Sequence, residues 1–164
     1  MKSGSWIALI VIFSLFYSDA AQAATTYLQG YSAVDGTAIE WGGTTTYATQ
    51  CSSAISTWNA RGKINITPDT IWTLEDLTFS DVNSTASWYN WYGKYQQRTG
   101  ADALWLNKAY MGSLSSTKKQ SVCTHELGHS LGLAHSIINN VMYATSWDTA
   151  LGTQDKSDYS SLYP

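Results

Sequence analysis

The pattern of apolar and polar residues predicts three helices. Residues 44–59 repeat apolar side chains with a period of 3.6, which predicts a helix with one buried stripe. This stripe consists of Tyr47, Ala48, Cys51, Ala54, Ile55 and Trp58. A second helix is predicted from Thr117 to Gly132, because glycine most readily adopts the left-handed conformation that ends a helix. A third helix is expected over residues 154–162.

Alternating apolar and polar residues predict strands before and after the first helix. Asp35-Gly36 is a turn signal that would join the first two strands as a hairpin, and Pro68 and Asp69 would turn the chain between the next two. The predicted strands are residues 27–31, 37–41, 63–67, 71–79, an aromatic edge strand at 87–95, and 101–107. Helices and strands in this order predict an α+β domain.

The N-terminal segment has the three parts of a secretory signal peptide. Lys2 supplies a positive charge, residues 6–17 form an apolar run, and Ala21 and Ala23 offer small residues for cleavage, so we expect removal of residues 1–23. The alternative is a membrane anchor, but a run of about 12 residues is shorter than the roughly 20 that cross a bilayer. Residues 24–164 are expected to form one exported domain.

The charge and composition of the chain indicate which classes of partner it can bind. The formal charge is -3, and Lys and Arg do not cluster, which argues against a nucleic-acid partner. The chain has no internal repeat and no low-complexity block. After removal of the N-terminal segment, we expect a monomer without a membrane partner.

Cys51 and Cys123 are the only cysteines. In an exported protein such a pair more often forms a disulfide than two free thiols, and we expect the disulfide. Zinc ligation by either thiol is a further alternative. It is the weaker one, because three histidines already stand at ligand spacing and neither cysteine has a second sulfur nearby.

All three histidines of the chain lie between His125 and His135. On a helix, residues i and i+4 share a face, so His125 and His129 can direct two imidazole nitrogens to one metal ion. Gly132 lets the chain turn so that His135 completes the set. Glu126 lies next to the first ligand without being a ligand itself. These residues predict a zinc site with three histidine ligands.

Three protein ligands leave the fourth position of a tetrahedral zinc open to water, as in a catalytic site. The metal would lower the pKa of this water towards about 7, and Glu126 would accept its proton during attack on a peptide carbonyl. One alternative is histidines that face solvent or are satisfied in the core, which leaves their spacing unexplained. A structural or inactive zinc site is the other, and the intact Glu126 argues against it.

Residues 125–135 resemble the extended zinc signature of the metzincins, a group of zinc endopeptidases. Ser136 and the sequence Val141-Met142-Tyr143 resemble the matrixin branch. The resemblance implies a small bacterial-type catalytic domain with a twisted mixed β-sheet, two long helices, a methionine turn and a C-terminal helix. The resemblance rests on specific motif residues over residues 125–163, and only on the order of helices and strands before them.

The resemblance also implies roles for residues outside the signature. Met142 would form an apolar floor beneath the zinc ligands; the alternative is an ordinary core methionine. Tyr143 follows it, as in matrixins, but Ala144 stands where matrixins usually have proline and other metzincins a zinc-contacting tyrosine. Asp155 would hydrogen-bond the methionine turn; the alternative is helix capping.

The cysteine-containing propeptide motif that silences classical matrixins is missing, so any latency would have another origin. The histidines that hold their structural zinc are missing too, so we expect one catalytic Zn2+. Asp76, Asp81 and Asp102 could bind Ca2+ but lack a recognisable loop spacing, and we expect solvated surface charges there. In this fold the first helix packs beside the zinc-binding helix, which would bring Cys51 and Cys123 together.

The sequence therefore predicts a secreted or periplasmic zinc endopeptidase whose polypeptide substrate lies as an extended strand along an edge of the sheet. The aromatic residues 88–95 would form part of that edge or cover the core. One alternative is an exported zinc module that binds a peptide or an inhibitor without turnover, which would not need Glu126. The other is hydrolysis of a non-peptide amide, which the length and order of the motif disfavour.

Overall fold

The structure is a computed structural model that describes residues 25–164. The expected signal peptide, residues 1–23, lies outside the described residues. Within them, the strands are β1 (Ala38–Gly43), β2 (Asn65–Pro68), β3 (Leu77–Val82), β4 (Gly93–Gln96) and β5 (Asp102–Asn107). The helices of the described part are α1 (Ala48–Asn59), α2 (Lys108–Met111), α3 (Ser116–Ser130) and α4 (Thr153–Leu162).

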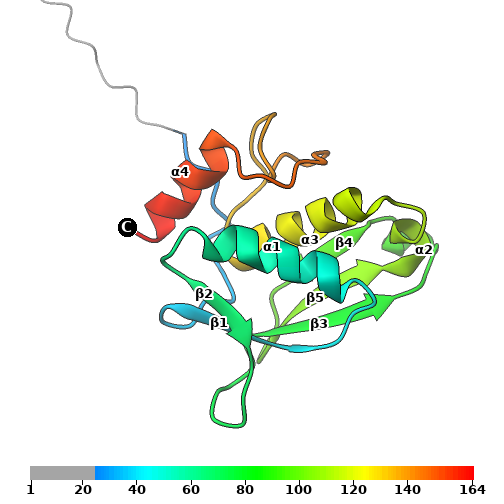
Figure 1. Cartoon of the computed structure of the whole chain (residues 1–164), viewed down its shortest axis with the longest axis horizontal. Coiled ribbons are helices and arrows are strands. Elements are labelled where there is room, and N and C mark those ends of the chain that lie inside the picture. Colours follow the sequence, from blue (N-terminus) through cyan, green and yellow to red (C-terminus); the bar gives the residue numbers. More distant parts are fainter. Residues whose placement is uncertain (1–24) are drawn as a thin grey trace, which may run out of the picture.

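The strands form one mixed sheet in the order β2-β1-β3-β5-β4. β1 pairs in parallel with β2 and β3, β3 pairs in parallel with β5, and β4 is antiparallel at the edge. Parallel neighbours need a crossover connection, and α1 supplies it between β1 and β2. Figure 1 shows α1 and α3 beside each other over the same face of the sheet. The mixed sheet with its helices confirms the predicted α+β class.

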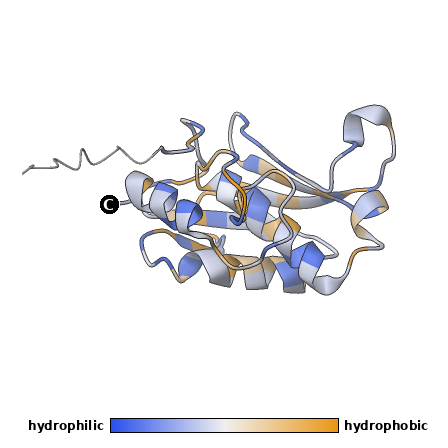
Figure 2. Cartoon of the chain, turned by 90° about the horizontal axis from the view of Figure 1, so that it is seen from above, coloured by the Kyte–Doolittle hydropathy of each residue, from blue (hydrophilic) through white to orange (hydrophobic). Residues whose placement is uncertain are grey.

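The core lies between this face of the sheet and the two long helices. Along β3, the buried Leu77 and Phe79 alternate with the half-buried Thr78 and Ser80. Figure 2 shows hydrophilic and hydrophobic residues alternating along the helices. The buried apolar residues of α1 and α3 include Cys51, Ala54, Trp58, Val122, Cys123 and Leu127. Burial of their apolar stripes against the sheet therefore holds α3 in a defined position.

Two links join α1 to α3. The buried indole N–H of Trp58 on α1 donates to the backbone oxygen of Thr124 on α3 at 2.9 Å. Cys51 and Cys123 form the expected disulfide, with 5.2 Å between their Cα atoms. The zinc-motif helix is therefore tied to the first helix one and two residues before its first histidine.

The predicted helices are confirmed, with small shifts at their ends. α1 begins four residues later than expected because the preceding threonines bind β3 instead: the Thr45 hydroxyl and the Thr46 backbone N–H donate to the carboxylate of Asp81, at 2.6 and 2.8 Å. The short α2 was not predicted. None of the helices within residues 25–164 has the length and apolarity to cross a membrane.

The predicted opening hairpin is wrong. Residues 27–31 form no strand with β1, which instead pairs with β2 and β3. The segment lies along the turn after α3, where Gln29 N–H donates to the Gly132 oxygen at 2.9 Å and Ala134 N–H to the Tyr27 oxygen at 2.8 Å. The Asp35-Gly36 turn does form, but it closes only a local loop. Partners distant in sequence replaced the local pairing.

Two further strands are shorter than predicted. The strand expected at 71–79 begins only at Leu77, and residues 71–76 form a loop whose first four residues are exposed. In the aromatic stretch 87–95, Ser87–Tyr89 is a 3-10 helix and only the last part belongs to the edge strand β4. The rings serve different purposes: Trp91 stacks on Trp105 at 6.5 Å between centroids, whereas Tyr95 is buried in the core.

Candidate metal centre

The C-terminus of α3 sets the direction of the chain towards the third histidine. Gly132 has a φ of 90°, the left-handed conformation predicted for it. Its N–H donates to the His129 oxygen at 2.9 Å, and the N–H of Leu133 donates to the Gly128 oxygen at 3.0 Å. These two bonds form a Schellman motif, which ends the helix and reverses the chain. His135 follows on the returning segment.

The structure brings the three predicted zinc ligands together. The ligand atoms of His125, His129 and His135 all lie within 4.8 Å of one another. The ring centroids are 4.8 to 5.1 Å apart. Within residues 25–164, this trio is the one group of metal-ligating side chains close enough to hold an ion.

Backbone carbonyls orient two of the rings. The Nδ1 atom of His125 lies 2.8 Å from the oxygen of Val141, and that of His129 lies 2.8 Å from the oxygen of Leu133. Because a carbonyl oxygen only accepts hydrogen bonds, each Nδ1 carries the proton and leaves Nε2 with a free lone pair. The donor set therefore fits zinc, which binds neutral imidazole.

Burial keeps these rings uncharged. It lowers the pKa of His125 and His135 below the ordinary value, and it lowers the pKa of His129 to about 3. Neutral imidazoles do not have to lose a proton before they bind a metal at neutral pH. His135 is the most exposed of the three, so the trio is open to solvent on its side.

Glu126 lies beside the trio with its side chain almost fully buried. The backbone N–H of Tyr95 on β4 donates to its Oε2 at 2.8 Å. Burial raises the pKa of Glu126 to about 7, against the opposing effect of this hydrogen bond. A carboxyl group with a pKa near the working pH is suited to exchange protons with a reacting molecule.

Gly93 allows β4 to approach Glu126, a role that no sequence pattern indicated. A Cβ at position 93 would lie 2.6 Å from Cγ of Glu126 and 2.8 Å from Cγ1 of Val122. Both contacts are shorter than side chains tolerate, so any larger residue would push β4 away from α3. Sequence patterns mark glycines that form turns, whereas Gly93 is the first residue of the strand β4.

Gly93→Ala is expected to displace Glu126 and to destabilise the fold by about 1–3 kcal/mol, the usual cost of overpacking. Chemical denaturation measures the stability. The displacement of Glu126 is expected to lower the rate of peptide hydrolysis, the activity that the metzincin resemblance implies. The matched control is Gly100→Ala, where a Cβ would meet nothing within 4 Å but the φ of 85° is strained. This control should lose stability without a comparable loss of activity per folded molecule; equal activity of the two variants contradicts the role of Gly93.

Met142 lies beneath α3 and is completely buried. A Cβ on Gly128 would lie 2.2 Å from its Sδ, so Gly128 makes the room that the methionine occupies. Met142 is also part of the general core, so the geometry fits both the expected floor beneath the ligands and a core methionine. Of the atoms around Gly128, the Sδ of Met142 is the one that a Cβ there would meet most closely.

Asp155 on α4 is buried beside the methionine turn. Its Oδ2 accepts the backbone N–H of Val141 at 2.7 Å and that of Gly152 at 2.9 Å, and its Oδ1 accepts the N–H of Met142 at 3.1 Å. The side chain therefore bonds to the methionine turn and to the start of α4 at the same time. Both alternatives, support of the turn and helix capping, apply to this one residue.

Two polar residues near the centre escaped the sequence analysis. Gln29 lies beside the ring of His129 and donates through Nε2 to the Leu133 oxygen at 2.5 Å, the same oxygen that orients this ring. Asn140 accepts the N–H groups of Gln154 and Asp155 at 2.9 and 3.2 Å, and so caps α4. Both form hydrogen bonds with backbone groups that are distant in the sequence, so no local sequence motif predicts them.

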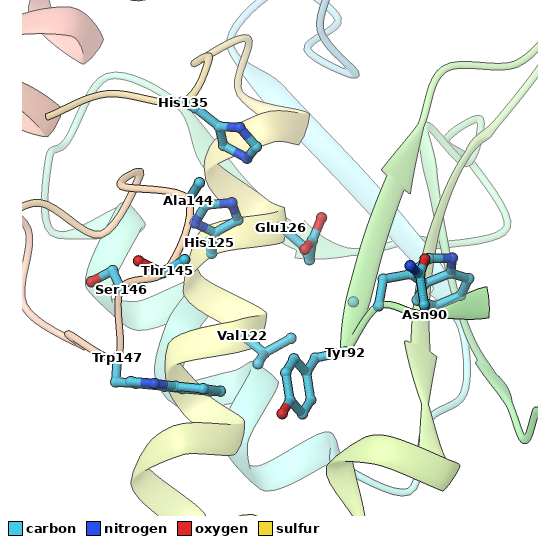
Figure 3. Close-up of a pocket in the computed structure, with 12 residues that line it drawn as sticks. Asn90, Tyr92, Val122, His125, Glu126, His135, Ala144, Thr145, Ser146 and Trp147 are labelled. Atoms are coloured by element: carbon cyan, nitrogen blue, oxygen red, sulfur yellow. The ribbon is translucent and has the colours of Figure 1, made fainter. Parts of the chain in front are cut away.

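A cavity of about 370 Å³ opens next to the trio. His125, Glu126 and His135 lie on its wall, as Figure 3 shows. Tyr92 and Trp147 line its other end, where their rings meet edge to face with 5.4 Å between the centroids. The cavity has the size of a site for a small organic group or a side chain.

Other predicted site residues lie outside this cavity or at its rim. Ala144 lines the cavity, whereas the side chain of Tyr143 does not. Asp76 and Asp81 accept hydrogen bonds from neighbouring strands and loops. Asp102 is not the solvated surface charge that was expected: it is 5% exposed and accepts the backbone N–H of Arg98 at 2.7 Å.

A mixed sheet covered by α1 and α3, with three histidines on α3 and the turn after it, defines a metzincin-type zinc metallopeptidase fold. The model of the matrixin family matches residues 27–164, and the chain belongs to this family of zinc metallopeptidases. The match covers both the C-terminal zinc motif and the sheet that precedes it. A comparison with curated proteins finds no similar sequence.

Proposed function

We propose that the protein is an exported zinc endopeptidase that hydrolyses polypeptides, with His125, His129 and His135 as metal ligands and Glu126 as general base. The observation that carries this proposal is the position of Glu126: a buried carboxyl group beside three neutral imidazoles on the wall of one open cavity. A site that only held a metal would have no use for such a group.

Zinc, when bound, acidifies a water molecule and polarises a carbonyl group. Glu126 would take the proton from the attacking water and transfer it to the amine that leaves when the peptide bond breaks. The Tyr95 N–H would hold one oxygen of Glu126 in place during both transfers. The carbonyl bonds to His125 and His129 would keep their rings aimed at the metal.

The edge strand β4 is the place where we expect the polypeptide substrate to bind. It is the last strand of the sheet, and Gly93 at its start lines the cavity that also contains Glu126. An extended peptide that pairs with this edge would carry its scissile bond past the trio. The cavity that Tyr92 and Trp147 line would then receive one of its side chains.

Export agrees with the disulfide, since such bonds persist in oxidising compartments outside the cytoplasm. We therefore place the mature protein in the periplasm or the medium, after removal of residues 1–23, as a monomer. The rival proposal is an exported zinc module that captures a peptide or an inhibitor without turnover. It shares the fold and the metal, and only turnover separates the two.

Removal of the metal tests the proposal. A chelator is expected to abolish cleavage of a mixed peptide library, and about one equivalent of Zn2+ per chain should restore it. Metal analysis of the purified protein measures the stoichiometry, and mass spectrometry identifies the cleaved bonds. Stoichiometric zinc with peptide binding and no cleavage favours the binding module, and full cleavage after complete removal of the metal contradicts both.

A further inference from the structure

The loop between β2 and β3 carries the most exposed apolar residues of the described part of the chain. Ile71, Trp72 and Leu74 are each 88% exposed, whereas Trp88, the next, is 74% exposed. Figure 1 shows this loop extending beyond the ends of β1 and β2, away from α1 and α3. We call these three side chains the apolar tip. Large apolar groups gathered on a surface mark a place of contact.

The tip is held out by its own hydrogen bonds. The hydroxyl of Thr73 donates to the carboxylate of Asp69 at 2.5 Å and accepts the N–H of Thr70 at 2.9 Å. At the base, Asp69 N–H donates to the Trp41 oxygen at 2.8 Å and Asp76 N–H to the Glu40 oxygen at 2.7 Å. The polar groups occupy the inside of the turn, so the apolar side chains point outwards.

The charges around the tip limit what it can contact. Asp69, Glu75 and Asp76 flank it, and no Lys or Arg occurs between Lys63 and Lys94. Arg98 lines the same hollow as Leu74, Glu75 and Asp76, but Asp35 and Asp102 line it too, so acidic residues outnumber the basic one. Acidic flanks repel phosphate-rich and anionic surfaces. A partner surface must therefore be electrically neutral, with an apolar interior that the tip can reach while the carboxylates stay in water.

The area of the tip is too small for a stable protein interface. Three large side chains supply at most about 600 Å², whereas a stable interface buries about 800 Å² on each partner. The acidic flanks offer no apolar surface to extend it. A convex tip also needs a matching hollow in a folded partner, while a lipid surface adapts to it.

We propose that the apolar tip inserts shallowly into the interface of a neutral phospholipid bilayer. Trp72 would lie at the level of the headgroups, where tryptophan is enriched, and Ile71 and Leu74 would reach the start of the acyl chains. Such insertion needs no membrane-spanning helix. It revises the expectation of no membrane partner, and it holds whether or not the protein is a peptidase.

Flotation with phosphatidylcholine vesicles tests the proposal on the exported, processed protein. The wild type is expected to float with the vesicles, and brominated acyl chains should quench part of its tryptophan emission. The triple variant Ile71→Ser, Trp72→Ser, Leu74→Ser is expected to bind the vesicles with a partition coefficient lower by a factor of about ten or more. Its thermal unfolding midpoint should stay at the wild-type value, because none of the three side chains packs in the core.

Two further variants make the result specific. Trp88→Ser removes another exposed tryptophan outside the loop and should bind vesicles like the wild type. Trp72→Phe should bind but lose the quenched component. Because the attraction is apolar, about 1 M salt should leave binding unchanged.

Three results would overturn the proposal. The first is equal partition of the wild type and the triple variant, or no flotation of the wild type at saturating lipid. The second is binding to phosphatidylserine vesicles alone. The third is a dimer, or a complex with a purified protein, that depends on the tip and forms without any binding to vesicles.

Discussion

Replacing Glu126 with glutamine is expected to lower kcat/KM for peptide hydrolysis by about 10²- to 10⁴-fold, the range that general base catalysis contributes. Glutamine keeps the shape of the side chain and an oxygen that can accept the Tyr95 N–H. It has no carboxylate to take the proton of the attacking water. Steady-state cleavage of a fluorogenic peptide measures the loss.

The zinc content separates this result from a damaged site. The three histidines are unchanged in Glu126→Gln, so the variant should still bind about one zinc per chain. Glu40→Gln is the matched control, because Glu40 lies on β1 and does not line the cavity. A Glu126→Gln protein that holds zinc and cleaves peptides like the wild type would exclude Glu126 as the base.

Asp155→Asn is expected to lower the free energy of unfolding by about 3 kcal/mol. The carboxylate accepts two backbone N–H groups of the buried methionine turn and one at the start of α4, and an amide at this position offers only one acceptor oxygen. At least one buried N–H then loses its partner. Urea denaturation measures the change, and Asp148→Asn, at an exposed position, should alter stability by less than about 0.5 kcal/mol.

The same substitution should also weaken the metal site. Asp155 binds the N–H of Val141, and the oxygen of Val141 in turn orients the ring of His125. Loss of such an outer partner typically reduces metal affinity by about 10- to 100-fold. Competition with a zinc chelator measures the affinity. Wild-type affinity in a destabilised Asp155→Asn protein would show that Asp155 supports the fold and not the metal ligands.

The zinc motif could be predicted from sequence because its geometry is local. His125 and His129 share a helix face by their spacing alone, and Gly132 ends that helix in the conformation expected for glycine. The helices were found for the same reason, since their apolar stripes depend on residues three and four positions apart. Their ends were less certain, as the threonines before α1 show.

The pairing of strands and the close contacts between segments depend on residues far apart in the sequence. The sequence analysis predicted some of them wrongly and missed others. The hairpin at residues 27–41 was wrong because β1 finds its partners in β2 and β3, and the extended segment before it pairs with the turn after α3. In the stretch 87–95, aromatic composition predicted a strand, but Ser87–Tyr89 is a 3-10 helix, and the side chain of the distant Asn107 donates to its Tyr89 oxygen at 2.9 Å.

The sequence by itself therefore determined which histidines share the spacing of metal ligands, which acid stands next to them, and where the three longer helices lie. Only the tertiary structure decided how deeply Glu126 is buried, that Gly93 and Gly128 leave room for their neighbours, and that Gln29 reaches the turn after α3. The physical reason is distance along the chain. Helical periodicity acts over a few residues, whereas desolvation and close packing depend on side chains that folding brings together from separate segments.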